Sequence, residues 1–244
     1  MSERPDVSVL MAVYNGVENY PTHCALGAAI LRSLYEQAGV TVEVCAVDDA
    51  STDASWSTLQ TFADLCNVKI ARHATNRGPA AAYQTAAEMA TGRYIILQSV
   101  RSWYEPGAFA LMVNALDENP DIGFVYGKTQ YHGAREDTYT PPPFVRSRFW
   151  HSFDSLFGYM YRREALDAGC EYVGYLQRDG RPVDVADYDF VMQLVVKMGW
   201  RGLALRDALC LHYWYSGEGQ QTNLVHEYQA EIDHIFAERW GHSG

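Results

Sequence analysis

Short apolar segments that alternate with helical segments constrain the fold of this chain most strongly. The first apolar segment is nearly continuous from Val7 to Tyr14 and ends at Asn15-Gly16, which is typical of a strand buried on both faces that leads into a loop. Three similar runs follow, separated by segments whose apolar residues recur at helical spacing. The sequence therefore predicts an α/β fold with a mostly parallel, twisted central sheet flanked by helices. The expected strands are residues 7–14, 42–47, 68–71 and 94–97, and the helices between them end near residues 39, 65 and 90.

The second half of the chain is less regular. Helices are expected over residues 106–116 and 184–198, a strand over 123–126, and an extended or mixed segment over 203–213. Regularity fades from Lys128 to Trp150, and a long irregular segment in a compact enzyme is often a substrate loop or lid. The segment from Leu224 to Trp240 predicts an amphipathic helix that could pack on the same chain or on a partner, so the oligomeric state stays open.

The composition excludes several classes of protein. A chain of 244 residues with 48% apolar residues is long enough for one large or two small globular units. The net charge is −11, and no run of Lys or Arg provides a surface for nucleic acid or an anionic membrane. No apolar stretch reaches the roughly 20 residues of a transmembrane helix, and the N-terminus lacks a signal-peptide pattern. The scattered cysteines include no Cys-x-x-Cys pair, so reduced thiols in a soluble cytoplasmic protein are expected.

Polar residues follow each of the first four apolar runs. In an open parallel sheet, ligands bind beyond the carboxyl ends of the strands, so these positions are the first candidates for a site. Each one alone is more often a loop or a helix cap, but their joint placement favours a ligand site. The candidates are Tyr14 and Asn15 after the first run, Asp48 and Asp49 after the second, Asn76, Arg77 and Gly78 after the third, and Ser99 and Arg101 after the fourth.

Five segments in this part of the chain resemble the successive blocks of family 2 glycosyltransferases with the GT-A fold. The resemblance implies a single GT-A-like domain over residues 1–244, with a nucleotide-sugar-binding half at 1–105 and an acceptor-binding half at 106–244. It also implies that Tyr14 packs on the base of the nucleotide, while Asp48 or Asp49 accepts a hydrogen bond from the base or the ribose. The segments are residues 7–15, 47–53, 76–82, 90–94 and 103–108.

The fourth block departs from the family pattern. An Asp-x-Asp-Asp stretch, which holds Mn or Mg against the diphosphate, is expected where this chain has Ser99-Val100-Arg101-Ser102. Hard divalent cations need anionic oxygen ligands, so we assign no metal ligand here. Three interpretations stay open. Arg101 replaces the metal charge with its guanidinium group, or the site has lost its activity, or Glu105 or a later acidic residue recruits the ion.

A later segment is similar to the acceptor-side block of the family, in which an acidic pair opens a helix. The usual first member is Ala186 here, so the resemblance implies that Asp187 is the general base, with Asp189 as the alternate. For an isolated Asp at a helix start, a favourable interaction with the helix dipole is the simpler explanation. The segments are residues 157–163, 169, 187–190 and 197–200.

Aromatic residues and a histidine complete the candidate site. His212 follows an apolar segment, where it either reaches the phosphates or is a satisfied histidine near the core. Trp103 and Trp214 could pack on the C–H face of a sugar ring, although core packing is their default role.

The sequence therefore predicts a glycosyltransferase, inverting, that moves a sugar from a nucleotide-sugar donor, with UDP favoured, to a hydroxyl of a saccharide or glycan acceptor. The alternative is a non-catalytic nucleotide-sugar or glycan-binding relative that has lost the metal centre. A sugar nucleotidyltransferase is disfavoured, because the loop from Tyr14 to Glu18 contains no basic residue.

Overall fold

A mixed β-sheet forms the centre of the molecule. The computed structural model describes residues 4–17, 26–65, 67–146, 158–176, 182–183, 186–215 and 239–240. Within them, nine strands form one sheet of order β3-β2-β1-β4-β8-β6-β11-β5, with β7 paired to β6, and β9 and β10 form a separate hairpin. The strands are β1 (Val7–Val13), β2 (Val42–Asp48), β3 (Val68–Arg72), β4 (Tyr94–Gln98), β5 (Ser102–Tyr104), β6 (Ile122–Gly133), β7 (Thr138–Tyr139), β8 (Met160–Arg162), β9 (Tyr175–Leu176), β10 (Pro182–Val183) and β11 (Arg201–Tyr215).

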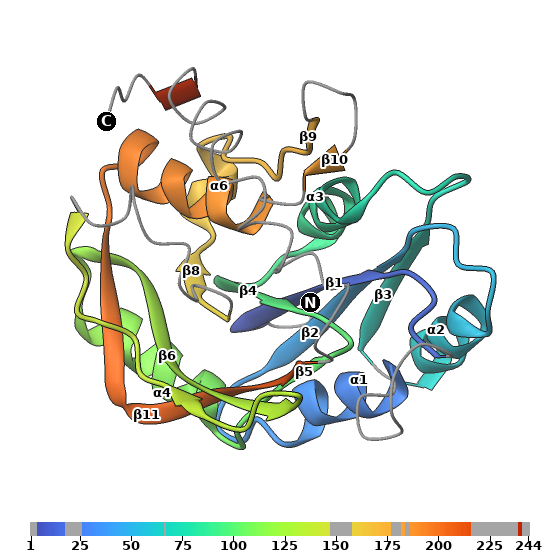
Figure 1. The fold of residues 1–244 in the computed structure, drawn as a ribbon, viewed down its shortest axis with the longest axis horizontal. Coiled ribbons are helices and arrows are strands. Elements are labelled where there is room, and N and C mark those ends of the chain that lie inside the picture. Colours follow the sequence, from blue (N-terminus) through green and yellow to red (C-terminus); the bar gives the residue numbers. More distant parts are fainter. Residues whose placement is uncertain are drawn as a thin grey trace.

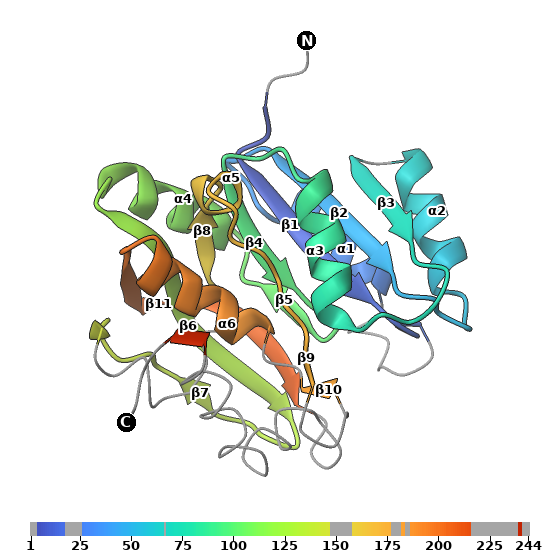
Figure 2. The same ribbon diagram turned by 90° about the horizontal axis from the view of Figure 1, so that it is seen from above.

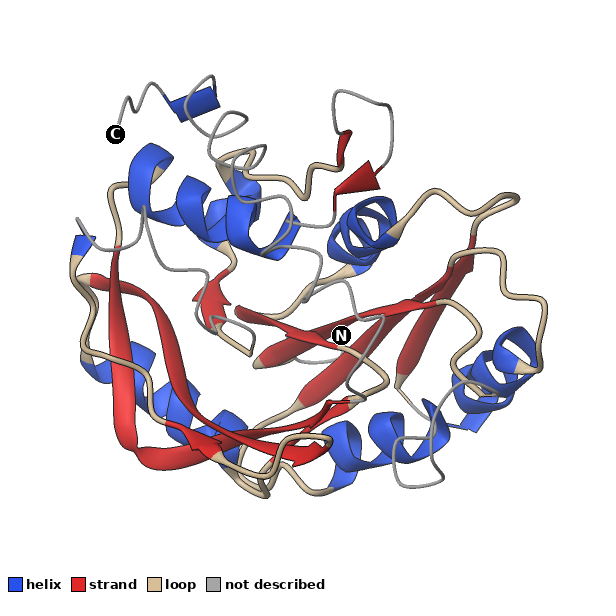
Figure 3. Cartoon of the chain, viewed as in Figure 1, coloured by secondary structure: helices blue, strands red, loops and turns tan. Residues whose placement is uncertain are grey.

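Helices cover both faces of this sheet (Figures 1 and 3). Helices α3 and α6 pack on one face, where they share a core with Leu10 and Leu97, while α1, α2 and α4 pack on the other face around Val9 and Ile96. The helices are α1 (Leu26–Tyr35), α2 (Ser55–Leu65), α3 (Pro79–Met89), α4 (Ala108–Glu118), α5 (Glu164–Asp167) and α6 (Ala186–Met192), the last continued by a π-helical turn (Gln193–Lys197).

The four strands expected in the first half are confirmed. β1 pairs in parallel with β2 and β4, and β2 pairs in parallel with β3. β1, β2 and β4 carry apolar runs because helices bury the side chains on both of their faces, whereas the edge strand β3 is only partly buried. Beyond β4 the sheet is mixed, since β8 is antiparallel to β4 and β6, and β5 is antiparallel to β11. The sheet therefore curls, and its short edge strand β5 comes to lie near α1 (Figure 1).

The expectation of an irregular segment from Lys128 to Trp150 is wrong for the first part of that range, which contains strands. β6 continues to Gly133, and β7 follows at Thr138–Tyr139. The end of β6 could not be recognised in the sequence because many of its side chains are polar. In the structure its backbone pairs with β11, as far as the pair of Gly133 and Tyr215. Residues 140–146 have little regular structure, and residues 147–150 lie outside the described part of the chain.

Other expectations in the second half are only partly covered by the described residues. Residues 203–213 lie within β11, and α6 begins at Ala186, with residues 184–185 undescribed. Of the helix expected from Leu224 to Trp240, only residues 239–240 are described, and they are helical. Across the described ranges, every helix is too short or too polar to cross a membrane. Three of the cysteines, Cys45, Cys170 and Cys210, are buried free thiols.

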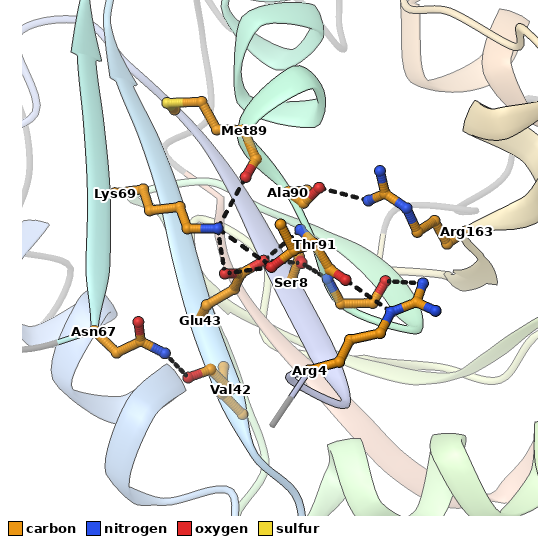
Figure 4. Close-up of polar contacts among 11 residues, drawn as sticks. Arg4, Ser8, Val42, Glu43, Asn67, Lys69, Met89, Ala90, Thr91 and Arg163 are labelled. Carbon is orange, nitrogen blue, oxygen red and sulfur yellow. Dashed lines mark hydrogen bonds and ion pairs between the residues drawn. The ribbon is translucent and has the colours of Figure 1, made fainter. Parts of the chain in front are cut away.

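A buried polar network holds the amino ends of the central strands together (Figure 4). The Glu43 side chain on β2 is only 2% exposed and lies 2.7 Å from Nζ of Lys69 on β3. It also accepts hydrogen bonds from Oγ of Ser8 on β1 and from the amide of Thr91, each at 2.6 Å. A Cβ atom on the neighbouring Gly92 would lie 2.7 Å from the Ser8 nitrogen, so only glycine fits this crossing. Strong polar pairing thus locks the amino edge, and the loops of the opposite edge form the candidate site.

Candidate active site

The loop after β1 and the loop after β2 are bound to each other. The Asn15 amide donates to Oγ of Ser51 at 3.0 Å, and the Thr52 amide donates back to Oδ1 of Asn15 at 2.8 Å. Asn15 has φ 49° and Ala50 has φ 64°, and within the described chain these are the non-glycine residues with positive φ. Backbone strain of this kind clusters at ligand-binding sites, because the surrounding structure must hold it in place.

Asp48, at the end of β2, carries an unmet hydrogen-bond acceptor. Its side chain is fully buried, and Oδ1 accepts from the Ser51 amide at 2.8 Å and lies 3.5 Å from Nε of Arg72. Oδ2 has no hydrogen-bond partner. Every other buried side-chain nitrogen or oxygen atom in the described residues has one. An unsatisfied buried acceptor is unfavourable and rare in folded proteins, so it marks a position where a ligand N–H or O–H would be stabilising.

Asp49, the next residue, uses both of its carboxylate oxygens within the protein. Oδ1 lies 2.6 Å from Nδ1 of His73 and accepts from the Arg77 amide at 2.9 Å, while Oδ2 accepts from the Gly78 amide at 2.8 Å. Asp49 is 3% exposed. The geometry therefore distinguishes the two residues that the sequence left as alternatives: Asp48 keeps one acceptor without a partner, and Asp49 shapes the loop between β3 and α3.

A cavity of about 350 Å³ opens beside these loops, lined by Ala50, Arg72, His73 and Ala74. Arg72 connects the cavity wall to the turn that follows Asp48, because its Nη2 donates to the Ser51 carbonyl at 2.9 Å. Its guanidinium also lies 5.4 Å from the Trp56 ring. Sequence reasoning missed Arg72 and His73, although Arg72 ends β3 and His73 follows it, shortly before the loop at residues 76–78 that was predicted to bind a ligand. Tyr14, which is 49% exposed, and Asn76, which is also exposed, follow β1 and β3 at the same edge of the sheet.

The turn from Ser99 to Ser102 is closed by its own hydrogen bonds. The Arg101 amide donates to Oγ of Ser99 and the Ser102 amide donates to the Ser99 carbonyl, both at 3.1 Å. The Arg101 carbonyl accepts from the Trp214 amide at 2.8 Å, and the guanidinium of Arg101 lies 5.3 Å from the Tyr213 ring. No carboxylate belongs to this turn, and the described residues contain no cluster of three or more His, Cys, Asp or Glu side chains arranged for a metal. The residues of this turn do not fit a Mn or Mg ion.

His212 lies in a chain of hydrogen-bonded side chains, on the face of β11 opposite to the Tyr213 side chain. Its Nε2 lies 2.6 Å from Oε2 of Glu105, and its Nδ1 lies 2.9 Å from Nε2 of His132. Trp103 stacks on His212 with 5.1 Å between ring centroids. Because side chains alternate along a strand, this group faces away from Tyr213 and so from the ring on which Arg101 stacks. The geometry thus favours a structural role for His212, Trp103 and Glu105, and His132 was missed because it lies in the stretch expected to be irregular.

Asp187 and Asp189 in the first turn of α6 have different surroundings. Oδ1 of Asp187 accepts from the Tyr188 amide at 2.8 Å, and burial raises the pKa of the Asp187 carboxyl. A raised pKa brings a carboxylate closer to the range in which a general base works near neutral pH. Asp189 is fully buried, and it binds Gln193 and the described C-terminal residues of the chain. Its position favours a structural role.

Tyr159 connects α6 to the edge of the sheet that carries the Ser99–Ser102 turn. Its hydroxyl donates to the Asp187 carbonyl at 3.1 Å. A Cβ atom on the preceding Gly158, which has φ +85°, would lie 2.8 Å from Cδ2 of Leu211, so the backbone packs directly on β11. Figure 2 shows α6 lying across this part of the sheet. The candidate base is thus fixed relative to β11, which also holds the Arg101 carbonyl.

A curled mixed sheet with loops of this kind at its carboxyl edge defines the GT-A fold of glycosyltransferases. The S. aureus protein TarS in complex with UDP-GlcNAc has the same fold, with a TM-score of 0.70 at 18% identity over 89% of this chain and 60% of that chain. The mannosyltransferase PcManGT from Pyrobaculum calidifontis, in complex with GDP-Man and Mn2+, has a TM-score of 0.69 at 21% identity over 100% of this chain and 66% of that chain.

The sequence comparisons identify the family. The profile described as Glycosyl transferase family 2 matches residues 8–175, and the chain therefore belongs to glycosyl transferase family 2. The succinoglycan biosynthesis protein ExoO of Rhizobium meliloti is 28% identical over 169 residues, which cover 64% of this chain and 46% of that protein. The match thus spans about half the length of this curated relative.

Proposed function

We propose that this protein is an inverting glycosyltransferase that takes a sugar from a UDP-sugar and transfers it to a hydroxyl of a glycan acceptor. The unmet Oδ2 acceptor of Asp48 carries this proposal, because the same carboxylate pairs through Oδ1 with Arg72, which lines the cavity at the carboxyl edge of the sheet. The imide N–H of uracil is a donor that would satisfy a carboxylate oxygen in this position. The structures of TarS with UDP-GlcNAc and of PcManGT with GDP-Man support a nucleotide-sugar ligand for this fold.

In the proposed reaction, Asp187 accepts the proton of the acceptor hydroxyl while the oxygen attacks the anomeric carbon. The new C–O bond forms on the side opposite the diphosphate, and the bond from the anomeric carbon to the diphosphate oxygen breaks with its electron pair. Arg101 donates hydrogen bonds to the leaving diphosphate and neutralises part of its charge, which a guanidinium group can do with two N–H donors at once. Because the Ser99–Ser102 turn does not fit a metal ion, no step is assigned to one.

Release of UDP from a panel of UDP-sugars, with and without EDTA, tests the proposal. We expect release in the presence of EDTA, and we expect Asp187→Asn to remove it while UDP binding persists. Asp207→Asn, at an exposed carboxylate on β11, is the matched control and should behave as the wild type. Full turnover by Asp187→Asn would refute the base assignment, and complete loss with EDTA would refute the role of Arg101.

A non-catalytic sugar-nucleotide-binding protein is the second candidate, and the absence of carboxylates from the Ser99–Ser102 turn is the observation that favours it. Calorimetry with UDP and UDP-sugars separates the two functions when it is run beside the turnover assay. Binding without UDP release from any donor, with a mixture of oligosaccharides as acceptors, would favour the binding protein.

A further inference from the structure

The two carboxylates in the first turn of α6 lie on opposite sides of the helix. Successive residues of an α-helix are about 100° apart, so Asp187 and Asp189 differ by about 200°. Phe190 and Val191 lie on the side of Asp187 and are fully buried in the core between the helix and the sheet. Asp189 therefore belongs to the outer side of α6, which faces away from the sheet.

The described C-terminal residues cover this outer side. Oδ1 of Asp189 lies 3.2 Å from Nε of Arg239 and 3.3 Å from Nε1 of Trp240. Figure 1 shows residues 239–240 beyond α6, on the side opposite the sheet. These contacts explain why Asp189 is 0% exposed although it points away from the main core.

Asp189 also connects to the segment before α6. Its Oδ2 accepts from Nε2 of Gln193 at 2.9 Å. The Gln193 side chain in turn donates to the Glu171 carbonyl at 2.7 Å and accepts from the Glu171 amide at 3.1 Å. The outer side of the helix is therefore tied both to the C-terminal residues and to the chain that follows α5.

Such ties matter because α6 is short. A helix of seven residues that is continued only by a short π-helical turn is not stable by itself, so its position and its rotation about its own axis are set by the contacts on its two sides. Phe190 packs on Tyr172 of the inner side with 4.3 Å between ring centroids. On the outer side, the charged pair of Asp189 and Arg239 opposes any rotation, because a rotation would leave a buried carboxylate without its cation.

We propose that Arg239 and Trp240 are positioning residues, which hold Asp189 on the outer side of α6 and thereby keep Asp187 on the opposite side, from which it would meet the acceptor hydroxyl as the base. The inference rests on the proposed function for the role of Asp187 as the base. The position of Asp187 itself can be tested without any turnover.

The test compares Arg239→Ala with Arg239→Lys in the full chain. The carboxyl carbon of Asp187, assigned by its loss in Asp187→Asn, is titrated by NMR, and hydrogen exchange of the α6 amides is followed in parallel. We expect Arg239→Ala to lower the pH at which Asp187 titrates, because more water reaches a carboxyl that the wild-type fold holds half-buried. Exchange in α6 should be faster by about tenfold or more, while UDP binds within about twofold of wild type. Arg239→Lys should restore both, because it keeps the cation.

Turnover gives the catalytic readout. With a donor that the UDP-sugar panel identifies, Arg239→Ala should lower kcat by about tenfold or more at an unchanged KM, because the base is displaced and the donor site is not. Trp240→Phe, which keeps an aromatic ring and removes the indole N–H, should show the same changes at a smaller size and serves if Arg239→Ala does not fold. An unchanged Asp187 titration and unchanged α6 exchange in a folded variant would overturn the inference. A parallel fall of kcat and UDP binding would overturn it as well. Full turnover by Asp187→Asn would instead remove the base assignment, and the titration of Asp187 in the Arg239 variants would still report whether Arg239 and Trp240 position α6.

Discussion

Nδ1 of His73 lies 2.6 Å from Oδ1 of Asp49, and both side chains are buried at the edge of the candidate nucleotide site. A carboxylate has no proton to give, so Nδ1 of His73 carries the hydrogen. The other ring nitrogen, Nε2, lies 3.1 Å from Oγ1 of Thr85 on α3. His73 thus links α3 to Asp49, which in turn holds the amides of Arg77 and Gly78.

From this link we predict that His73→Phe weakens UDP binding by about threefold to tenfold, because Asp49 loses one donor and keeps two. Calorimetry with UDP measures the change. Asp49→Asn should weaken binding more, and the double variant should be less impaired than the product of the two single effects, because both substitutions act on one network. Effects that multiply independently would contradict the proposed link.

The unmet acceptor of Asp48 leads to a second prediction. In Asp48→Asn the amide oxygen must accept from the Ser51 amide, so the NH₂ group occupies the position of Oδ2. A donor would then face the N–H of the base, and affinity should fall by about tenfold to a hundredfold. The factor should be the same for uridine as for UDP, because the contact is with the base. A loss confined to UDP would place Asp48 at the phosphates instead.

Arg101 gives a third prediction, which depends on the charge of the leaving group. Arg101→Ala should lower UDP release by about a hundredfold or more, as expected when a group that stabilises developing charge is removed. Arg101→Lys should recover only part of this loss, because it keeps the charge but not the two-donor geometry. The Trp214 amide donates to the Arg101 backbone and should hold the turn in both variants. Equal activity of Arg101→Ala and wild type would show that the guanidinium does not stabilise the leaving group.

The elements of the fold that could be predicted are those whose own residues show a clear hydrophobic pattern. β1, β2 and β4 are buried on both faces, so each is an apolar run that ends at a polar loop, and their positions could be predicted closely. β3 is a partly buried edge strand, and its short apolar pattern was sufficient to predict it. The end of β6 could not be predicted, because residues 128–133 are largely polar and form a strand only by pairing with β11. That partner is distant in the sequence: His132 and His212, which are hydrogen-bonded, lie 80 residues apart.

The choice between Asp48 and Asp49 could not be predicted either. Both residues precede the same turn, and their roles differ only in which amides and side chains meet each carboxylate oxygen. Likewise, the sequence could place Asp189 next to the candidate base but not the C-terminal residues that cover it. Arg239 reaches Asp189 only through the tertiary fold.

The last prediction concerns stability at the opposite edge of the sheet. Burial alone would raise the pKa of Glu43, but hydrogen bonds from Lys69, Ser8 and Thr91 outweigh it, and the pKa is lowered from its ordinary value of 4.5. A carboxyl whose pKa is lower in the folded state stabilises the fold above its unfolded pKa, and this contribution is lost as the pH falls through the folded pKa. We therefore expect Glu43→Gln to destabilise the protein at pH 7, by about 1–3 kcal/mol, because one strong acceptor is replaced by a weaker one.

Urea unfolding at a series of pH values measures this difference. The gap between wild type and Glu43→Gln should stay constant at neutral pH and close below pH 4.5, where wild type loses the charge that the variant never had. Asp117→Asn is the matched control, because Asp117 also pairs with a cation, at 3.1 Å from Arg93, but is 44% exposed. An exposed pair contributes less than about 1 kcal/mol, so the control should lose much less stability at pH 7. If the two variants lost equal stability, the buried network would not be what locks the amino ends of β1, β2 and β3.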